Sequence, residues 1–123
     1  MDAFFFDPDV VRLPPESVRL TDLRATPLAD GRRVHIWLEL TPFEKRPEIE
    51  LNLTAPGGEA CGLASIVEPV AWKLELTMHI RSVGSPLVRE TAGRYELIAI
   101  LLYPEIGEVD RRSTKFMIPA TMD

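Results

Sequence analysis

Strict alternation of apolar and polar residues is the feature that most constrains the fold of this chain. It runs through three segments: RVHIWLELT (33–41), EIELNLT (48–54) and AWKLELTMHIR (71–81). Successive side chains of a β-strand point to opposite faces, so a period of two predicts strands with one buried and one solvated face. An amphipathic helix needs apolar residues three and four positions apart, and these segments do not supply them. The sequence therefore predicts β-structure.

The parity of each segment assigns its buried side. The residues expected to face inward are Val34, Ile36, Leu38 and Leu40, then Ile49, Leu51 and Leu53, and finally Trp72, Leu74, Leu76, Met78 and Ile80. Their neighbours, including His35, Trp37, Glu39 and His79, are expected to face outward.

Four further segments are predicted to be strands. RYELIAILLY (94–103) is apolar at nearly every position after its glutamate, which favours a central strand covered on both faces, or one whose outer face is covered by an extra element. Shorter strands are predicted at 62–67 and 113–118, and another at 17–28 with a bulge near Thr21 and Asp22, where the parity changes. Turn signals such as Asp30-Gly31, and the prolines, separate the strands. Seven or eight short strands without a convincing helix predict an all-β antiparallel sandwich.

The two ends of this pattern resemble a known family of folds. AGRYELIAILLY (92–103) followed by RRSTKFMI (111–118) is similar to the last hairpin of immunoglobulin-like and fibronectin type III-like sandwiches, and PPESVRLTDLRATPL (14–28) is similar to their opening. The resemblance implies a fold and no reaction. It also implies that Tyr95 bonds its hydroxyl to the preceding connection. The cysteine pair of antibody-type domains is not matched, because Cys61 is the sole cysteine.

The predicted fold class is thus an all-β, immunoglobulin-like antiparallel β-sandwich of about seven to eight strands. Its domain organisation is an extended N-terminal arm (1–16), the sandwich (17–119) and a short C-terminal tail (120–123). A net charge of −5 argues against nucleic-acid or anionic-membrane partners, which need a basic surface. No stretch approaches the roughly 20 apolar residues of a membrane span, and residues 1–20 lack a signal peptide's pattern. We therefore expect a cytoplasmic protein.

No arrangement of residues points to catalysis, and we expect no enzymatic activity, no cofactor and no metal. A Gly-x-Ser-x-Gly elbow is missing from the sequence. A site with two histidines and one carboxylate can be drawn from His35 and His79 with a nearby glutamate, which leaves a metal-binding protein as one alternative. Cys61 has no basic neighbour in the sequence to lower the pKa of its thiol, so we interpret it as a buried small residue.

The N-terminal aromatic run Phe4, Phe5 and Phe6 is unusual, because exposed apolar patches invite association unless something covers them. Three interpretations remain open. The arm folds back onto its own sandwich as an edge strand, or it crosses to a neighbouring subunit and forms a homodimer. Alternatively, it is a recognition peptide for another protein's sheet edge or groove.

Outward-facing Trp37, together with Phe43 at the end of the same strand, is the other candidate binding surface, since tryptophan is enriched at interaction hot spots. The leading hypothesis is a non-catalytic protein-interaction or assembly module that uses sheet edges, Trp37, Phe43 and the three arm phenylalanines. The alternative is a small-molecule or carbohydrate-binding sandwich in which Trp37 stacks on a ring.

Overall fold

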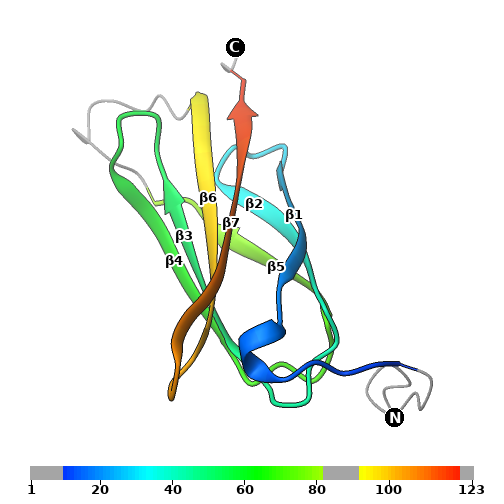
Figure 1. Ribbon diagram of the computed structural model, residues 1–123. Coiled ribbons are helices and arrows are strands. Elements are labelled where there is room, and N and C mark those ends of the chain that lie inside the picture. Colours follow the sequence, from blue (N-terminus) through cyan, green and yellow to red (C-terminus); the bar gives the residue numbers. More distant parts are fainter. Residues whose placement is uncertain (1–9, 82–91, 120–123) are drawn as a thin grey trace.

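The computed structural model describes residues 10–81 and 92–119, which form two antiparallel sheets packed face to face (Figure 1). A short 3-10 helix, η1 (Pro15–Ser17), precedes the first strand. The strands are β1 (Leu20–Pro27), β2 (Arg33–Leu40), β3 (Glu48–Thr54), β4 (Ala60–Val67), β5 (Lys73–His79), β6 (Gly93–Tyr103) and β7 (Gly107–Ile118). Within those residues no helix is long and apolar enough to cross a membrane.

The chain crosses from one sheet to the other three times, after β2, after β4 and after β5. One sheet has the order β1-β2-β5 and the other the order β4-β3-β6-β7, and every pairing is antiparallel. The predicted all-β sandwich is therefore confirmed. The predicted bulge in β1 is also present, as a register shift between Leu20 and Asp22.

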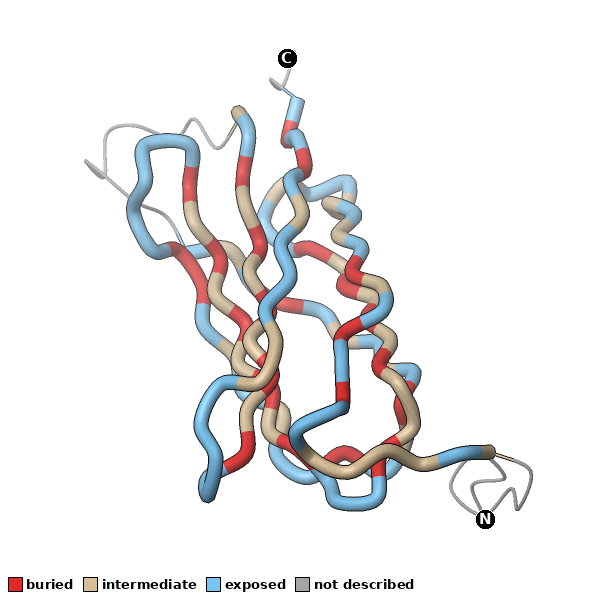
Figure 2. Tube along the Cα trace, in the orientation of Figure 1, coloured by how far each residue is buried: buried red, intermediate tan, exposed pale blue. Residues whose placement is uncertain are grey.

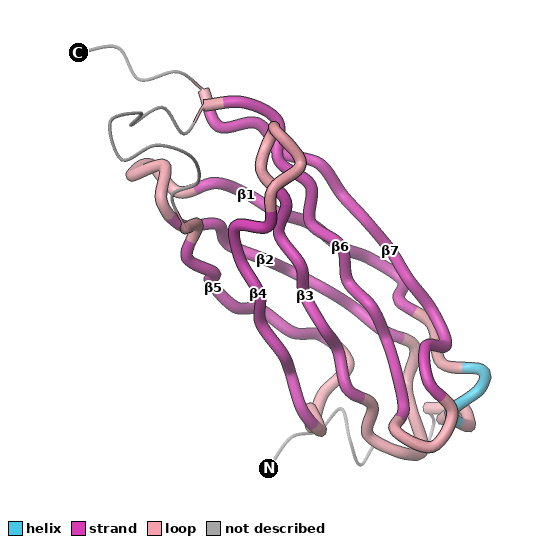
Figure 3. The backbone as a smooth tube through the Cα atoms, turned by 90° about the vertical axis from the view of Figure 1, so that its left-hand side faces the viewer, coloured by secondary structure: helices cyan, strands magenta, loops and turns pink. Residues whose placement is uncertain are grey.

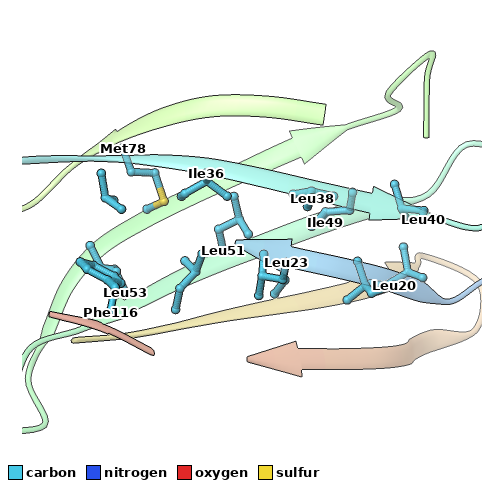
Figure 4. Packing of buried hydrophobic residues seen from close by; sticks show 14 of the residues in the cluster. Leu20, Leu23, Ile36, Leu38, Leu40, Ile49, Leu51, Leu53, Met78 and Phe116 are labelled. Atoms are coloured by element: carbon cyan, nitrogen blue, oxygen red, sulfur yellow. The ribbon is translucent and has the colours of Figure 1, made fainter. Parts of the chain in front are cut away.

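The hydrophobic core lies between the two sheets. Figure 2 shows buried and less buried residues alternating along the strands, as the period of two requires. All four inward residues of β2 and all three of β3 are at most 3% exposed. Figure 4 shows side chains of the two layers pointing toward one another, among them Leu23, Ile36, Leu38, Ile49, Leu51 and Leu53. Burial of such side chains contributes roughly 1.5–3 kcal/mol each.

Two strands differ from their predictions. β7 begins at Gly107, six residues before the predicted segment. Its first half pairs with β6 although its sequence, GEVDRR, is mostly polar. β6 lies centrally between β3 and β7, as expected, but only one face is fully covered. The residues of its other face, Ile98, Ile100 and Leu102, are half-buried.

The two long sides of the sandwich are closed to different degrees. On one side β1 packs against β7, where a carboxylate oxygen of Asp110 accepts a hydrogen bond from the backbone N–H of Leu20 at 2.8 Å. On the other side β4 and β5 make few contacts. Figure 3 faces the four-stranded sheet, and β4 and β5, which are both sheet edges, lie toward the left of that view. The backbone N–H of Arg81 donates to the carbonyl of Cys61 at 2.8 Å and joins the two layers at one end.

A tyrosine hydroxyl fixes the far end of β6. Tyr103 is fully buried, and its hydroxyl donates a hydrogen bond to the backbone carbonyl of Lys45 at 2.7 Å. Tyr95 is also buried, with its ring stacked on Phe116 at 5.4 Å between centroids. The connection that precedes Tyr95 is mostly outside the described residues, so the hydroxyl bond expected for Tyr95 stays a prediction.

Candidate functional site

The predicted aromatic surface is not assembled as the sequence suggested. Phe4, Phe5 and Phe6 lie outside the described residues. Phe43 is fully buried and meets Trp72 edge-on, with 6.3 Å between ring centroids. The expectation that Phe43 lies on an outer face is therefore wrong. The physical reason is that the segment after β2 turns into the core, where Phe43 also forms a parallel bridge with Leu13.

Trp37 does occupy the outer face of the three-stranded sheet, where it is half-buried. Its cross-strand neighbours are Arg24 on β1 and Glu75 on β5. His35, two residues earlier on β2, lies 3.2 Å from Glu75, measured between Nε2 and Oε1. This surface therefore places one aromatic ring in the middle of charged and hydrogen-bonding groups.

The two histidines do not meet in a metal site. The register places His35 opposite Thr77 and His79 opposite Arg33, so the histidines lie on neighbouring strands at offset positions. In residues 10–81 and 92–119 no group of three or more histidine, cysteine, aspartate or glutamate side chains is arranged to hold a metal ion.

An uncharged sheet edge stands out on the open side of the sandwich. β4 has the sequence ACGLASIV, with neither charge nor proline. Proteins protect exposed edges with charges, prolines or bulges, because an unpaired strand is a template for another strand. Of the four edge strands in the described part of the chain, β1, β5 and β7 each carry charged residues within the strand. β4 has one such feature, a bulge at which Cys61 is the extra residue opposite β3. After Cys61, the strand has no charge, proline or bulge.

The backbone of β4 presents hydrogen-bonding groups to this open side. The N–H of Glu68 donates to the carbonyl of Pro47, in register with the pair Ile66 and Ile49. In an antiparallel ladder, hydrogen-bonded and non-hydrogen-bonded pairs alternate. The N–H and C=O groups of the odd-numbered residues, Leu63, Ser65 and Val67, therefore face away from β3.

The side chains around these groups are exposed and mostly apolar. Leu63 is 68% exposed and Val67 is 62% exposed, while Ser65 lies exposed between them. Large apolar side chains this exposed are compatible with an interaction surface when they gather at one edge. Sequence reasoning missed these residues, although the uncharged run GLASIV was visible in it.

A shallow groove of about 400 Å³ lies beside the β4 edge and is lined by residues of β4, β5 and Arg81. Gly62 allows the layers to approach here, because a Cβ at this position would lie 3.2 Å from the Leu53 Cβ and from the Met78 Cε. Cys61 is fully buried next to it, and burial raises the pKa of its thiol. The thiol is therefore a poor nucleophile, and the groove offers packing surface.

Comparisons with known proteins support the β-sandwich fold and nothing more specific. No family model and no curated protein matches the chain. Among solved structures, a Lactobacillus rhamnosus β-glucuronidase is 15% identical, with a TM-score of 0.55. A β-glucuronidase from Ruminococcus gnavus in complex with D-glucuronic acid is 17% identical, with a TM-score of 0.54. Each match covers 83% of this chain, which spans 16% of the length of those enzymes. The chain thus shares a β-sandwich fold with one part of larger glycosidases.

Proposed function

We propose that this domain is a non-catalytic interaction module that binds an extended polypeptide segment along the edge of β4. The observation that carries the proposal is the row of outward-facing backbone groups at Leu63, Ser65 and Val67 on a strand without charge or proline. An extended segment that adds to a sheet edge gains affinity from main-chain hydrogen bonds and specificity from alternate side chains.

The surroundings of the edge supply the side-chain contacts that such binding needs. Alternate residues of the added segment would lie beside Leu63 and Val67 on the outer face. The other residues would point toward the groove beside β5, which is lined in part by Leu76 and Met78. A bound segment with apolar residues on both sides would therefore remove apolar surface from water on each side of the sheet.

The test is selection of binding peptides from a random displayed library on the full chain, followed by affinity measurements on two variants. Ser65→Pro removes the N–H that faces the edge and leaves the ladder to β3 intact, because proline is tolerated where its nitrogen faces outward. Ser65→Ala is the matched control, since it keeps the N–H. We expect the proline variant to lose roughly tenfold or more in affinity while the alanine variant binds normally. Equal binding to both variants would contradict the proposal.

A second candidate function rests on Trp37. Its ring is flanked across the sheet by Arg24 and Glu75, a combination suited to stacking on a sugar while hydrogen-bonding its polar groups. The likeness to a β-glucuronidase whose structure holds D-glucuronic acid makes this sugar acid a reasonable probe.

Titration of D-glucuronate against tryptophan fluorescence tests this second function. Binding at Trp37 would change the emission of the full chain and leave that of Trp37→Phe unchanged, because the remaining Trp72 is buried. An unchanged emission of the unsubstituted chain at all sugar concentrations would exclude the role for Trp37.

A further inference from the structure

We propose that the segment bound by β4 is β4 of a second copy of this chain, in an antiparallel pair with its two-fold axis at Ser65. This inference rests on the proposed function and names its partner. Joining the two edges would continue the four-stranded sheet of one copy into that of the other, an isologous contact in which both copies use the same surface.

The register of such a pair is self-complementary. A two-fold axis at Ser65 places Ser65 opposite its own counterpart, and places Leu63 of each copy opposite Val67 of the other. The backbone groups of all three residues face away from β3, so each of these pairs exchanges both of its N–H···O hydrogen bonds. The two large apolar side chains that are exposed on β4 then cover one another across the new contact.

The charges of the molecule also favour this edge for self-association. The chain carries a net charge of −5, so two copies repel one another overall. β4 has no charged residue, and pairing it with itself brings no like charges into direct opposition. An equivalent two-fold pairing of β5 would place its Lys73 and Glu75 at the contact, and β1 already packs against β7.

The inward side of β4 is complementary as well. Ala64, which lines the groove, and Ile66 are only half-buried, although both pack against the core. In the Ser65-centred register, Ala64 of each copy lies opposite Ile66 of the other. Each of these two cross-strand pairs therefore combines a small and a large side chain. The pairing therefore completes the burial of core residues that the single sandwich leaves half-open.

Sedimentation velocity on the full chain over a wide range of concentrations is the primary test. We expect a reversible monomer–dimer equilibrium. Ser65→Lys places two lysines opposite one another at the axis and should raise the dimer dissociation constant by roughly tenfold. Ser113→Lys is the control, because it adds the same charge to an exposed serine on the outer face of the same sheet, on β7. A chain that stays monomeric at all concentrations, or a dimer equally sensitive to both substitutions, would overturn the proposal.

The register has its own test. The double variant Leu63→Lys, Val67→Lys places like charges opposite one another, while Leu63→Glu, Val67→Lys places opposite charges there. Only the second double variant should retain the dimer, and its association should weaken with added salt. Both replaced side chains are exposed, so neither variant removes core packing. Dimers of equal strength for the two variants would exclude the Ser65-centred register.

The outcomes separate this inference from the function on which it rests. A monomeric chain whose selected peptides still lose affinity with Ser65→Pro would refute self-pairing and retain the peptide-binding edge. A monomer whose peptides bind Ser65→Pro and Ser65→Ala equally would refute both. A dimer that dissociates when residues 1–9 are deleted and is insensitive to Ser65→Lys would assign association to the phenylalanine arm and would also overturn self-pairing.

Discussion

The hydroxyl of Tyr103 provides the sharpest quantitative prediction about the stability of this fold. It is fully buried and donates to the backbone carbonyl of Lys45, which anchors the connection between β2 and β3 to the end of β6. Tyr103→Phe removes one hydrogen bond and leaves the ring in place. At neutral pH we expect the free energy of unfolding to fall by about 1 kcal/mol, the usual net value of such a bond.

The same substitution should have the opposite effect in alkali. Burial, and secondarily the charge of Glu105, raise the pKa of Tyr103 from 10.0 to about 12. Between these values the unfolded chain releases the phenol proton while the folded chain retains it, so stability falls as the pH rises. By pH 11.5 this linkage removes roughly 2 kcal/mol from the unsubstituted protein and nothing from the phenylalanine variant. The variant should then be the more stable protein, by about 1 kcal/mol.

Urea unfolding followed by tryptophan fluorescence, at intervals from pH 8 to pH 11.5, measures this inversion. All other titrating groups are common to the two proteins, so their contributions cancel in the difference between the two curves. A stability difference that stays constant over the whole pH range would refute the argument. It would mean that the phenol of Tyr103 reaches water in the folded state as readily as in the unfolded chain.

The remaining predictions concern the core and the turns. Leu51→Ala, at a fully buried position, should lower the free energy of unfolding by about 2–5 kcal/mol in urea titrations, while Val67→Ala at the exposed edge should change it by less than about 0.5 kcal/mol. Gly93→Ala should lower the melting temperature more than Gly107→Ala. Both positions have positive φ, but a Cβ at Gly93 would also lie 2.6 Å from a proline ring. Cys61 should react with thiol reagents only as fast as the protein unfolds, and rapid labelling in native buffer would contradict its burial.

Most of the strands could be predicted because their information is local. In β2 and β3 every second residue is a large aliphatic, and one buried face is enough to produce that pattern. The first half of β7 could not be found in this way, because both of its faces there are largely polar. It is a strand because β6 beside it supplies the backbone partners.

The candidate site lies at a sheet edge because of the order of the strands, and the alternation of apolar and polar residues does not reveal that order. The sequence shows that GLASIV is apolar and uncharged, and such a run fits a covered central strand as well as an edge. Its position at the edge follows from β3 pairing with β6 on its other side, across more than 40 residues of chain. Phe43 was misplaced for a related reason, since grouping it with Trp37 assumes that the strand extends to Phe43, and β2 ends at Leu40.

The contact between β1 and β7 has a consequence for how this domain is made. Leu20 and Asp110, which close that side of the sandwich, are 90 residues apart in the chain. Synthesis from the N-terminus produces β1 and β2 long before β7. The side of the first sheet that contacts β7 in the folded domain therefore stays uncovered until β7 has been made. Contacts between residues so distant in sequence are slow to form, which places this sandwich among domains that fold in milliseconds to seconds. Until β7 has been synthesised, the nascent chain therefore exposes apolar surface that the folded domain buries.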